Sequence, residues 1–224
     1  MTNKPFLLSY YWTGALLLGA LLFTSSCETN EGNTDTWNRS VMLSHWADEI
    51  ILPSWNEFNI NSSEAAHAAD TFALKLDSTA FETLRSKYQS AYSSWQKVSL
   101  FEIGPGEQRN IRLRCNTYPT DTAVVKGSAE SFMVNSPPNL LLPSTFIQQG
   151  FPALDYLLFA KGSIKKQLEY YNFHPEVVGY IQLLFSNIAA LGSDVYNDWT
   201  SGYKATFIEA DGSSATASVN KMAN

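Results

Sequence analysis

The stretch Asp77–Val98, DSTAFETLRSKYQSAYSSWQKV, decides the fold class. Its apolar side chains recur three and four residues apart, which places them on one face of an α-helix. Asp77 and Ser78 can cap the first turn of that helix, because short polar side chains accept hydrogen bonds from free backbone N–H groups. The stretch therefore predicts an amphipathic helix with a buried stripe at Phe81, Leu84, Tyr88, Ala91, Trp95 and Val98.

The same spacing continues on both sides of this stretch. Before it, we expect a helix from about 37 to 59 with a kink near Pro53, and a second from Asn61 to about Leu76, where Asn61 and Glu64 resemble a capping box. After it, the pattern predicts helices at about 120–134, 145–160, 163–172 and 174–208, and another that begins near 215.

Two segments interrupt the helical pattern. Gly104-Pro105-Gly106 is expected to exclude regular structure within Phe101–Pro119, and Gly150 with Pro152 requires the 145–160 helix to kink or restart near 150. No β-hairpin signal and no alternation of strands with helices occurs along the chain. The sequence therefore predicts an all-α fold with bundle-like packing, resembling a four-helix bundle.

Composition limits the classes of function. The chain has 224 residues, of which 45% are hydrophobic and 16% charged, so it can bury an ordinary core and is not disordered as a whole. The net charge is −6 and no basic stretch stands out, which excludes nucleic acid as an expected partner. Two cysteines cannot form a disulfide-rich scaffold, and Cys115 is expected to be buried.

The first 36 residues are typical of an export signal and a tether. Lys4 precedes an apolar run from Phe6 to Phe23, and small residues lead to Cys27. The arrangement resembles a bacterial lipoprotein signal at 1–26, although Thr24 stands where Leu is usual, and lipid on Cys27 would anchor the chain to a membrane. Residues 27–36 then form a flexible tether and 37–224 a helical domain; the alternatives are an uncleaved membrane anchor and simple secretion.

Three segments carry a family resemblance, and a weaker fourth covers Trp199–Phe207. WQKVSLFEIGP at 95–105, NTYPTD at 116–121 and GFPALDYLLF at 150–159 resemble, in order and spacing, the motifs of the imelysin family. The residues that match its structural motifs are Gly104, Pro105, Asn116, Pro119 and Asp121, and those that match its signature block are Gly150, Pro152 and Asp155.

The resemblance implies an all-helical protein of two bundle-like halves, with the signature block at a cleft between them. Members are periplasmic or outer-membrane proteins linked to iron-regulated uptake, and some are classed as metallopeptidases. Because family chains usually exceed 300 residues, we expect this one to be a C-terminally truncated form in which the second half is missing or incomplete. The resemblance also places the protein in the bacterial envelope, as an outer-membrane lipoprotein that faces the periplasm or the cell surface.

The metal-binding pair of the family is altered here. Its signature has His and Glu three residues apart, whereas this chain has Pro152 and Asp155, so the nitrogen ligand is lost. His45 and Glu49 are candidates to complete a rearranged metal site with Asp155. Alternatively, Asp155 has a structural role, either as a helix cap or as the partner of an arginine among Arg109, Arg112 and Arg114.

No catalytic motif is present: the chain lacks a His-Glu-x-x-His helix, a Cys-x-x-Cys pair and a Gly-x-Ser-x-Gly elbow. The favoured hypothesis is a membrane-tethered, non-catalytic binding protein for iron or metal uptake, with its cleft near Asp155. Its expected partners are the membrane and iron-uptake components, and a divalent metal or iron is the candidate cofactor. The alternatives are a metallopeptidase with a rearranged site and a structural or interaction lipoprotein with a vestigial one.

Overall fold

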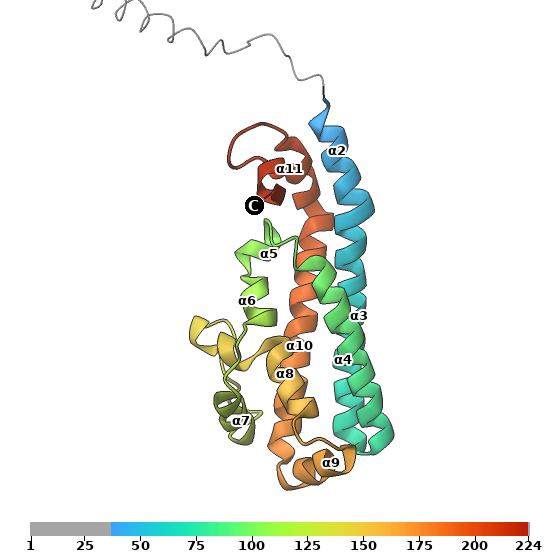
Figure 1. Ribbon diagram of the computed structural model, residues 1–224, viewed down its shortest axis with the longest axis vertical. Helices are drawn as coiled ribbons and strands as arrows, with labels where there is room; N and C mark the ends of the chain where they lie inside the picture. Colours follow the sequence, from blue (N-terminus) through green and yellow to red (C-terminus); the bar gives the residue numbers. More distant parts are fainter. Residues whose placement is uncertain (1–36, 224) are drawn as a thin grey trace, which may run out of the picture. The chain divides into compact units, whose positions relative to one another are not determined.

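A computed structural model describes residues 37–223, and the chain from Asn38 onward forms one compact unit (Figure 1). Every regular element in this described part is helical, and no strand occurs among residues 37–223. The predicted all-α class is therefore confirmed. The expected signal at 1–26, the tether and Cys27 lie outside the described residues.

The first long helical segment continues through residues 59–61, where the sequence predicted a boundary between two helices. It comprises α2 (Arg39–Trp46), a π-helical turn (Ala47–Ile51) and α3 (Leu52–Lys75). A kink was expected near Pro53, and the structure has a π turn that ends at Ile51, two residues before the proline. The separate helix predicted to begin at Asn61 is wrong, because a single buried stripe from Trp55 to Phe72 continues through the capping-like residues.

The helix α4 (Ser78–Val98) matches its prediction. The Asp77 side chain caps it and accepts a hydrogen bond from the backbone N–H of Ala80 at 2.8 Å. All six residues of the predicted stripe are buried. Fully burying a large apolar side chain contributes about 1.5–3 kcal/mol, so this stripe anchors α4 in the bundle.

The segment after α4 contains short helices, two of which the sequence did not predict. These are α5 (Pro105–Gln108) and α6 (Ile111–Asn116). The expectation that Gly104-Pro105-Gly106 excludes regular structure is wrong: Gly104 takes a positive φ of 51°, and Pro105 then occupies the first position of α5, which proline favours. The next two elements are α7 (Thr122–Glu130) and a 3-10 helix (Pro143–Gln148).

The predicted break near 150 is confirmed, because the 3-10 helix ends at Gln148 and α8 (Gly150–Phe159) begins after one extended residue. The helix α9 (Ile164–Phe173) is followed by α10 (Pro175–Asp198). The predicted continuation to Ile208 is interrupted by a π turn (Trp199–Tyr203) before α11 (Lys204–Glu209). The last described element is α12 (Ser218–Ala223).

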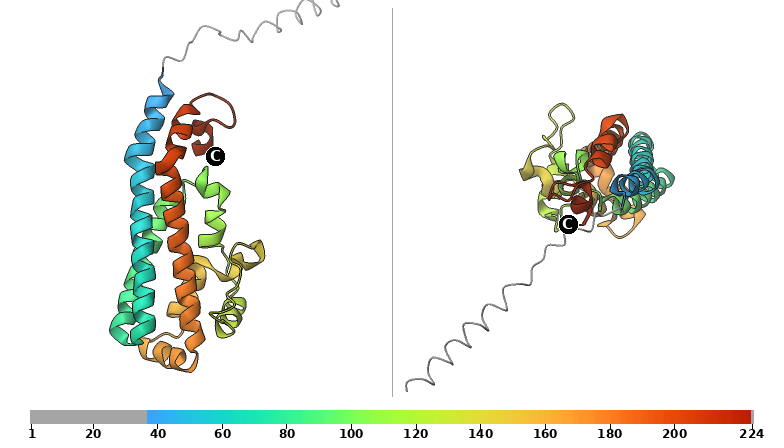
Figure 2. Two further views of the ribbon diagram at one scale, coloured as in Figure 1. Left: turned by 180° about the vertical axis from the view of Figure 1, so that it is seen from behind. Right: turned by 90° about the horizontal axis from the view of Figure 1, so that it is seen from above.

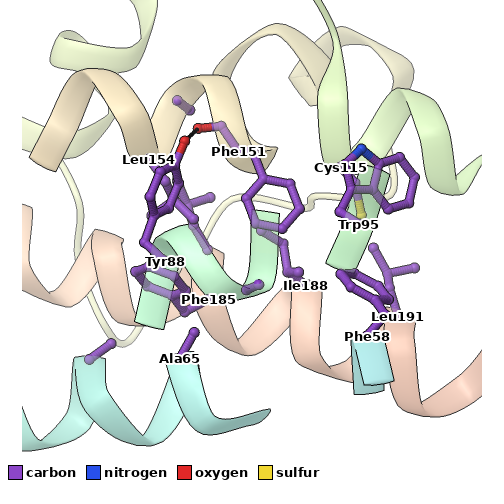
Figure 3. Packing of buried hydrophobic residues seen from close by; sticks show 14 of the residues in the cluster. Phe58, Ala65, Tyr88, Trp95, Cys115, Phe151, Leu154, Phe185, Ile188 and Leu191 are labelled. Atoms are coloured by element: carbon purple, nitrogen blue, oxygen red, sulfur yellow. Dashed lines mark hydrogen bonds between the residues drawn. The ribbon is translucent and has the colours of Figure 1, made fainter. Parts of the chain in front are cut away.

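The long helices form the body of the unit. The helix α3 packs along α4 and α10. The short helices α5, α6 and α7 lie on the opposite side of α10 from α3, as the ribbon views show (Figures 1 and 2). Aromatic residues fill the interior, where Tyr88 of α4 lies near Phe151 of α8 and Phe185 of α10 (Figure 3). Among residues 37–223, no helix is both long enough and apolar enough to cross a membrane.

Candidate functional site

A pocket of about 620 Å³ is the candidate site. Three parts of the chain form its walls: the middle of α4, the segment that joins α6 to α7, and one face of α8. Two of these parts contain motif residues that are separated by more than thirty positions in the sequence. The lining residues are Tyr88, Tyr92, Asn116, Tyr118, Thr120, Thr122, Pro152, Asp155, Tyr156, Phe159 and Ala160.

The α4 wall consists of two tyrosines one helical turn apart. Tyr88 is buried and its hydroxyl donates a hydrogen bond to the backbone carbonyl of Phe151 at 3.2 Å (Figure 3). The Tyr88 and Tyr92 rings are stacked, with centroids 6.1 Å apart and planes inclined by 17°. Burial, together with the negative charge of Asp155, raises the pKa of Tyr88 well above its ordinary value. Tyr88 therefore stays neutral, and the two rings of this wall present aromatic surface.

The α8 wall follows from helical spacing. Pro152, Asp155, Tyr156 and Phe159 stand at positions i, i+3, i+4 and i+7, which is one face of a helix. The opposite face carries Leu154 and Leu157, which are buried, and Phe151, one turn before Asp155, is buried among the rings of Tyr88, Tyr92, Trp95 and Phe58. Packing of Phe151 thus turns the signature positions Pro152 and Asp155 toward the pocket.

The third wall is the turn that connects α6 to α7. Asn116 ends α6, the Tyr118–Pro119 peptide bond is cis, and Thr120 donates a hydrogen bond to the carbonyl of Ile147. Asp121 caps α7 as predicted, because its carboxylate accepts from the backbone N–H of Ala123 at 2.9 Å and of Val124 at 3.1 Å. Asp121 therefore has a structural role, while Asn116, Tyr118 and Thr120 face the pocket.

A polar network behind the pocket fixes the start of α8. Gln149 is fully buried and donates to the carbonyl of Leu140 at 2.8 Å, while its side-chain oxygen accepts from Asn187 at 2.9 Å. Arg114 in turn donates to the Asn187 side chain at 2.8 Å. Partial burial lowers the pKa of Arg114. The network links α6, the residue before α8, and α10; the sequence pattern pointed to neither Gln149 nor Asn187.

The Gly104-Pro105 motif lies outside the pocket and has a packing role. A β-carbon added at Gly104 would lie 2.0 Å from the ring of Tyr203, so the glycine allows the π turn after α10 to pack directly on the start of α5. Tyr203 also meets Trp199 edge-on, with ring centroids 4.9 Å apart. The first and fourth segments of the family resemblance therefore contact each other, as the second and third do at the pocket.

The arginine partner considered for Asp155 is not found. Arg109 pairs with Asp198 at 2.6 Å, Arg112 pairs with Glu102 at 2.7 Å, and Arg114 bonds Asn187. The cap considered for Asp155 is also wrong, because Gln149 precedes α8 and Asp155 is the sixth residue of that helix. Asp155 is instead an exposed carboxylate at the pocket, and it forms no salt bridge with another residue of the described part.

The rearranged metal site is not assembled either. His45 and Glu49 are exposed on α2 and the π turn after it, at the end of the unit remote from α8 (Figure 1). Across residues 37–223, no three His, Cys, Asp or Glu side chains are grouped so that they could hold a metal ion. The buried stripe of this segment runs through Leu43 and Ala47, and the exposed His45 lies off it.

The donor atoms of the pocket do not fit a resident transition metal. Among the lining residues, Asp155 supplies the one carboxylate, and the remaining polar groups are hydroxyls and the Asn116 amide. Zinc and iron sites in proteins use several imidazole, thiolate or carboxylate ligands. With Pro152 in place of histidine, the pocket offers an aromatic surface with one negative charge rather than a coordination shell.

The sequence reasoning missed part of the lining. The helical spacing predicts Tyr88 as a core residue, and it does not predict Tyr92, Thr122, Tyr156 or Phe159 as site residues. Spacing offered a partial signal, since Tyr92 lies one turn after Tyr88 and Phe159 lies one turn after Asp155. Which helix face meets α8 depends on tertiary packing, which a single sequence does not specify.

Comparisons with known proteins agree with this fold. The family model described as Imelysin matches residues 51–224. The solved structure of an iron-regulated protein A precursor from Parabacteroides distasonis ATCC 8503 is similar, with a TM-score of 0.65 and 18% identity over 83% of this chain and 54% of that chain. An imelysin-like protein from Psychrobacter arcticum 273-4 is similar with a TM-score of 0.63 and 17% identity, over 83% of this chain and 57% of that chain.

This chain thus spans little more than half the length of either solved protein. No curated protein matches it. At such low identity the two structures support the helical fold alone, while the family model covers well over half of the sequence and includes both motif segments at the pocket. On that match, the chain belongs to the imelysin family.

Proposed function

We propose that this protein is a lipid-tethered binding protein of the bacterial envelope, linked to iron or metal uptake, whose ligand site is the pocket beside Asp155. The observation that carries the proposal is the convergence of two motif segments, 116–121 and 150–159, on one pocket. A motif that only caps a helix or forms a tight turn acts within its own segment. Two motifs that are distant in the sequence but line the same cavity instead favour the binding of a shared ligand.

A binding role suits the chemistry of the pocket better than hydrolysis. Metal-assisted peptide hydrolysis requires about three protein ligands and a bound water, and the lining contains one carboxylate. General acid–base chemistry usually employs a pair of titratable groups, and Tyr88, the ionisable neighbour of Asp155, is held neutral because its pKa is raised. The pocket can enclose a ligand, but it has no pair of groups poised to cleave one.

The tether and the link to iron rest on other features. The apolar run that ends at Cys27 is typical of lipoprotein signals, and acyl chains on that residue would hold the protein at a membrane. The link to iron follows the family resemblance and the description of the Parabacteroides distasonis protein as iron-regulated. Both features support a site at the cell envelope, where a captured ligand would pass to uptake components.

Complementation of a strain that lacks the gene tests the proposal. Under iron limitation, the wild-type gene should restore growth and cell iron content. Asp155→Ala should fail to restore them because the pocket loses its charge, and Cys27→Ala should fail because the protein is no longer lipid-labelled or held in the membrane fraction. Glu209→Ala, which removes an exposed carboxylate from α11, is the matched control and should behave as wild type.

Protein levels measured by immunoblot ensure that a failed variant is present in the cell. Full iron content with Asp155→Ala would contradict the role of the pocket. Continued lipid labelling of Cys27→Ala would contradict the proposed tether.

A further inference from the structure

The pocket is walled mainly by aromatic rings. Tyr88 and Tyr92 are stacked, and the Phe159 ring lies 5.7 Å from that of Tyr88. Tyr118 and Tyr156 extend the aromatic surface on the other two walls. The face of an aromatic ring carries negative potential and attracts cations, most strongly where water is partly excluded. Aromatic residues therefore give this pocket an affinity for positive charge on an apolar body.

The formal charge of the lining has the same sign. Asp155 is the one charged residue among the eleven that line the pocket. The cations near the lining already have partners: Lys161 lies over the Tyr170 ring at 4.1 Å, and Arg85 lies over the Phe159 ring at 4.5 Å and donates to the carbonyl of Leu158. Burial raises the pKa of the Tyr88 hydroxyl, and the negative charge of Asp155 raises it further. The one formal charge of the lining is therefore negative, and no lining residue offers a cation to an anionic ligand.

Other ligand classes fit less well. A bare metal ion would find one carboxylate and no imidazole or thiolate in the lining. A neutral sugar could stack on the rings and bond Asn116, but it would leave the charge of Asp155 uncompensated. A cation with apolar carbon satisfies both the rings and the carboxylate, and the Thr122 hydroxyl remains to bond a polar tail.

We infer that this pocket takes an organic cation, an ammonium group that carries apolar carbon, with Asp155 as its counter-ion and the tyrosine faces as its walls. The inference rests on the proposed function in one respect, namely that this pocket is the ligand site. It adds the chemical class of the ligand, which neither the family match nor the related structures specify.

A pair of probes with the same shape tests the charge requirement. The full chain is purified in a polyoxyethylene detergent, whose headgroup is neither a sugar nor an ammonium. It is titrated by NMR with choline and with 3,3-dimethylbutan-1-ol, in which carbon replaces the charged nitrogen. Choline should bind about tenfold more tightly, the factor that a single favourable charge contact in a partly wet site supplies.

Two variants locate the binding. Asp155→Asn keeps the shape and removes the charge, so choline affinity should fall about tenfold while that of the alcohol stays unchanged. The matched control is Asp211→Asn, which removes an exposed carboxylate from the loop before α12 and should bind choline as wild type does. Circular dichroism compares the folding of both variants.

Each remaining outcome overturns the inference. Equal affinity for choline and the alcohol, a methyl glucoside that binds in place of choline, or no binding of any probe would show that the pocket does not select an organic cation. Zinc chloride alone, if it binds wild type and not Asp155→Asn while choline fails, would replace the organic cation by a metal. The cell-iron experiment uses no probe, so a positive result there would leave the proposed function standing even if this inference failed.

Discussion

At the scale of single residues, Gly150 determines how closely two walls of the pocket approach each other. Its φ of +77° lies in the left-handed region, and a β-carbon there would be 2.4 Å from the carbonyl oxygen of Cys115. The first residue of α8 therefore rests directly on the backbone at the end of α6. Because Asn116 is the last residue of α6 and Asp155 lies on α8, this contact sets the distance between the two motif segments that line the pocket.

We expect Gly150→Ala to lower the free energy of unfolding by about 2–4 kcal/mol, since the left-handed backbone costs about 1–2 kcal/mol and a clash with backbone cannot be relieved by a rotamer change. Gly162→Ala is the matched control, because Gly162 has the same φ of +77° and nothing within 4 Å of the added carbon. In Gly162→Ala the free energy of unfolding should fall only by the cost of the left-handed backbone, about 1–2 kcal/mol. Urea unfolding of both variants measures the difference, and equal losses would contradict a packing role for Gly150.

The site was only partly predictable at this scale. The resemblance selected Asn116, Pro152 and Asp155, and the structure places all three at the pocket. It gave no information on the α4 wall, since Tyr92 lies beside the buried stripe and matches no motif. The suggested site at His45 and Glu49 failed because helical spacing tells which residues share a face of one helix, while contact between helices depends on the packing of the whole unit.

At the scale of elements, long helices with a continuous stripe were predictable and short ones were not. The stripe of α4 and its Asp77 cap were sufficient to place that helix. A local capping signal at Asn61 was overridden in α3, because burial along the stripe outweighs the preference of a single turn. The helix α5 was missed since four residues carry no periodicity, and the backbone of Gly104 and its contact with Tyr203 follow from tertiary packing.

The packing of α3 against α10 depends on a glycine in the middle of α10. A β-carbon at Gly192 would lie 3.0 Å from the Ser62 hydroxyl and 3.2 Å from the Phe58 ring, so Gly192→Leu should push the two helices apart and lower the free energy of unfolding by about 1–3 kcal/mol. The control is Gly127→Leu in α7, where nothing lies within 4 Å of an added β-carbon. This variant should raise the free energy of unfolding by about 0.5–1 kcal/mol, because leucine favours a helix more than glycine does. Urea unfolding measures both; a neutral Gly192→Leu would show that the helices are not tightly packed there.

At the scale of the whole molecule, buried tyrosine hydroxyls make the folded unit sensitive to alkali. Tyr88, Tyr171 and Tyr180 each donate to a backbone carbonyl, those of Phe151, Leu157 and Gln148. Burial raises the pKa of all three hydroxyls, to about 12 for Tyr180. Their neutral forms bond α4, α9 and α10 to the segment that contains α8, so ionisation would break the contacts that hold the pocket together.

The sign of the pH dependence follows from proton binding. Unfolded tyrosine ionises near pH 10, whereas these folded hydroxyls keep their protons, so stability is complete below about pH 10 and falls as the pH rises through the folded pKa values. At about pH 11 each group costs about 1.4 kcal/mol, and the three together about 4 kcal/mol relative to about pH 8. Urea unfolding at the two pH values measures the loss, and phenolate absorbance of the native protein should show that these tyrosines ionise at a higher pH than free tyrosine.

The variant Tyr180→Phe is the control. Its free energy of unfolding should be about 1 kcal/mol lower than that of the wild type near pH 8, because one hydrogen bond is deleted, and the further loss near pH 11 should be smaller than in the wild type. Equal stability of the wild type at both pH values would contradict the burial of these hydroxyls.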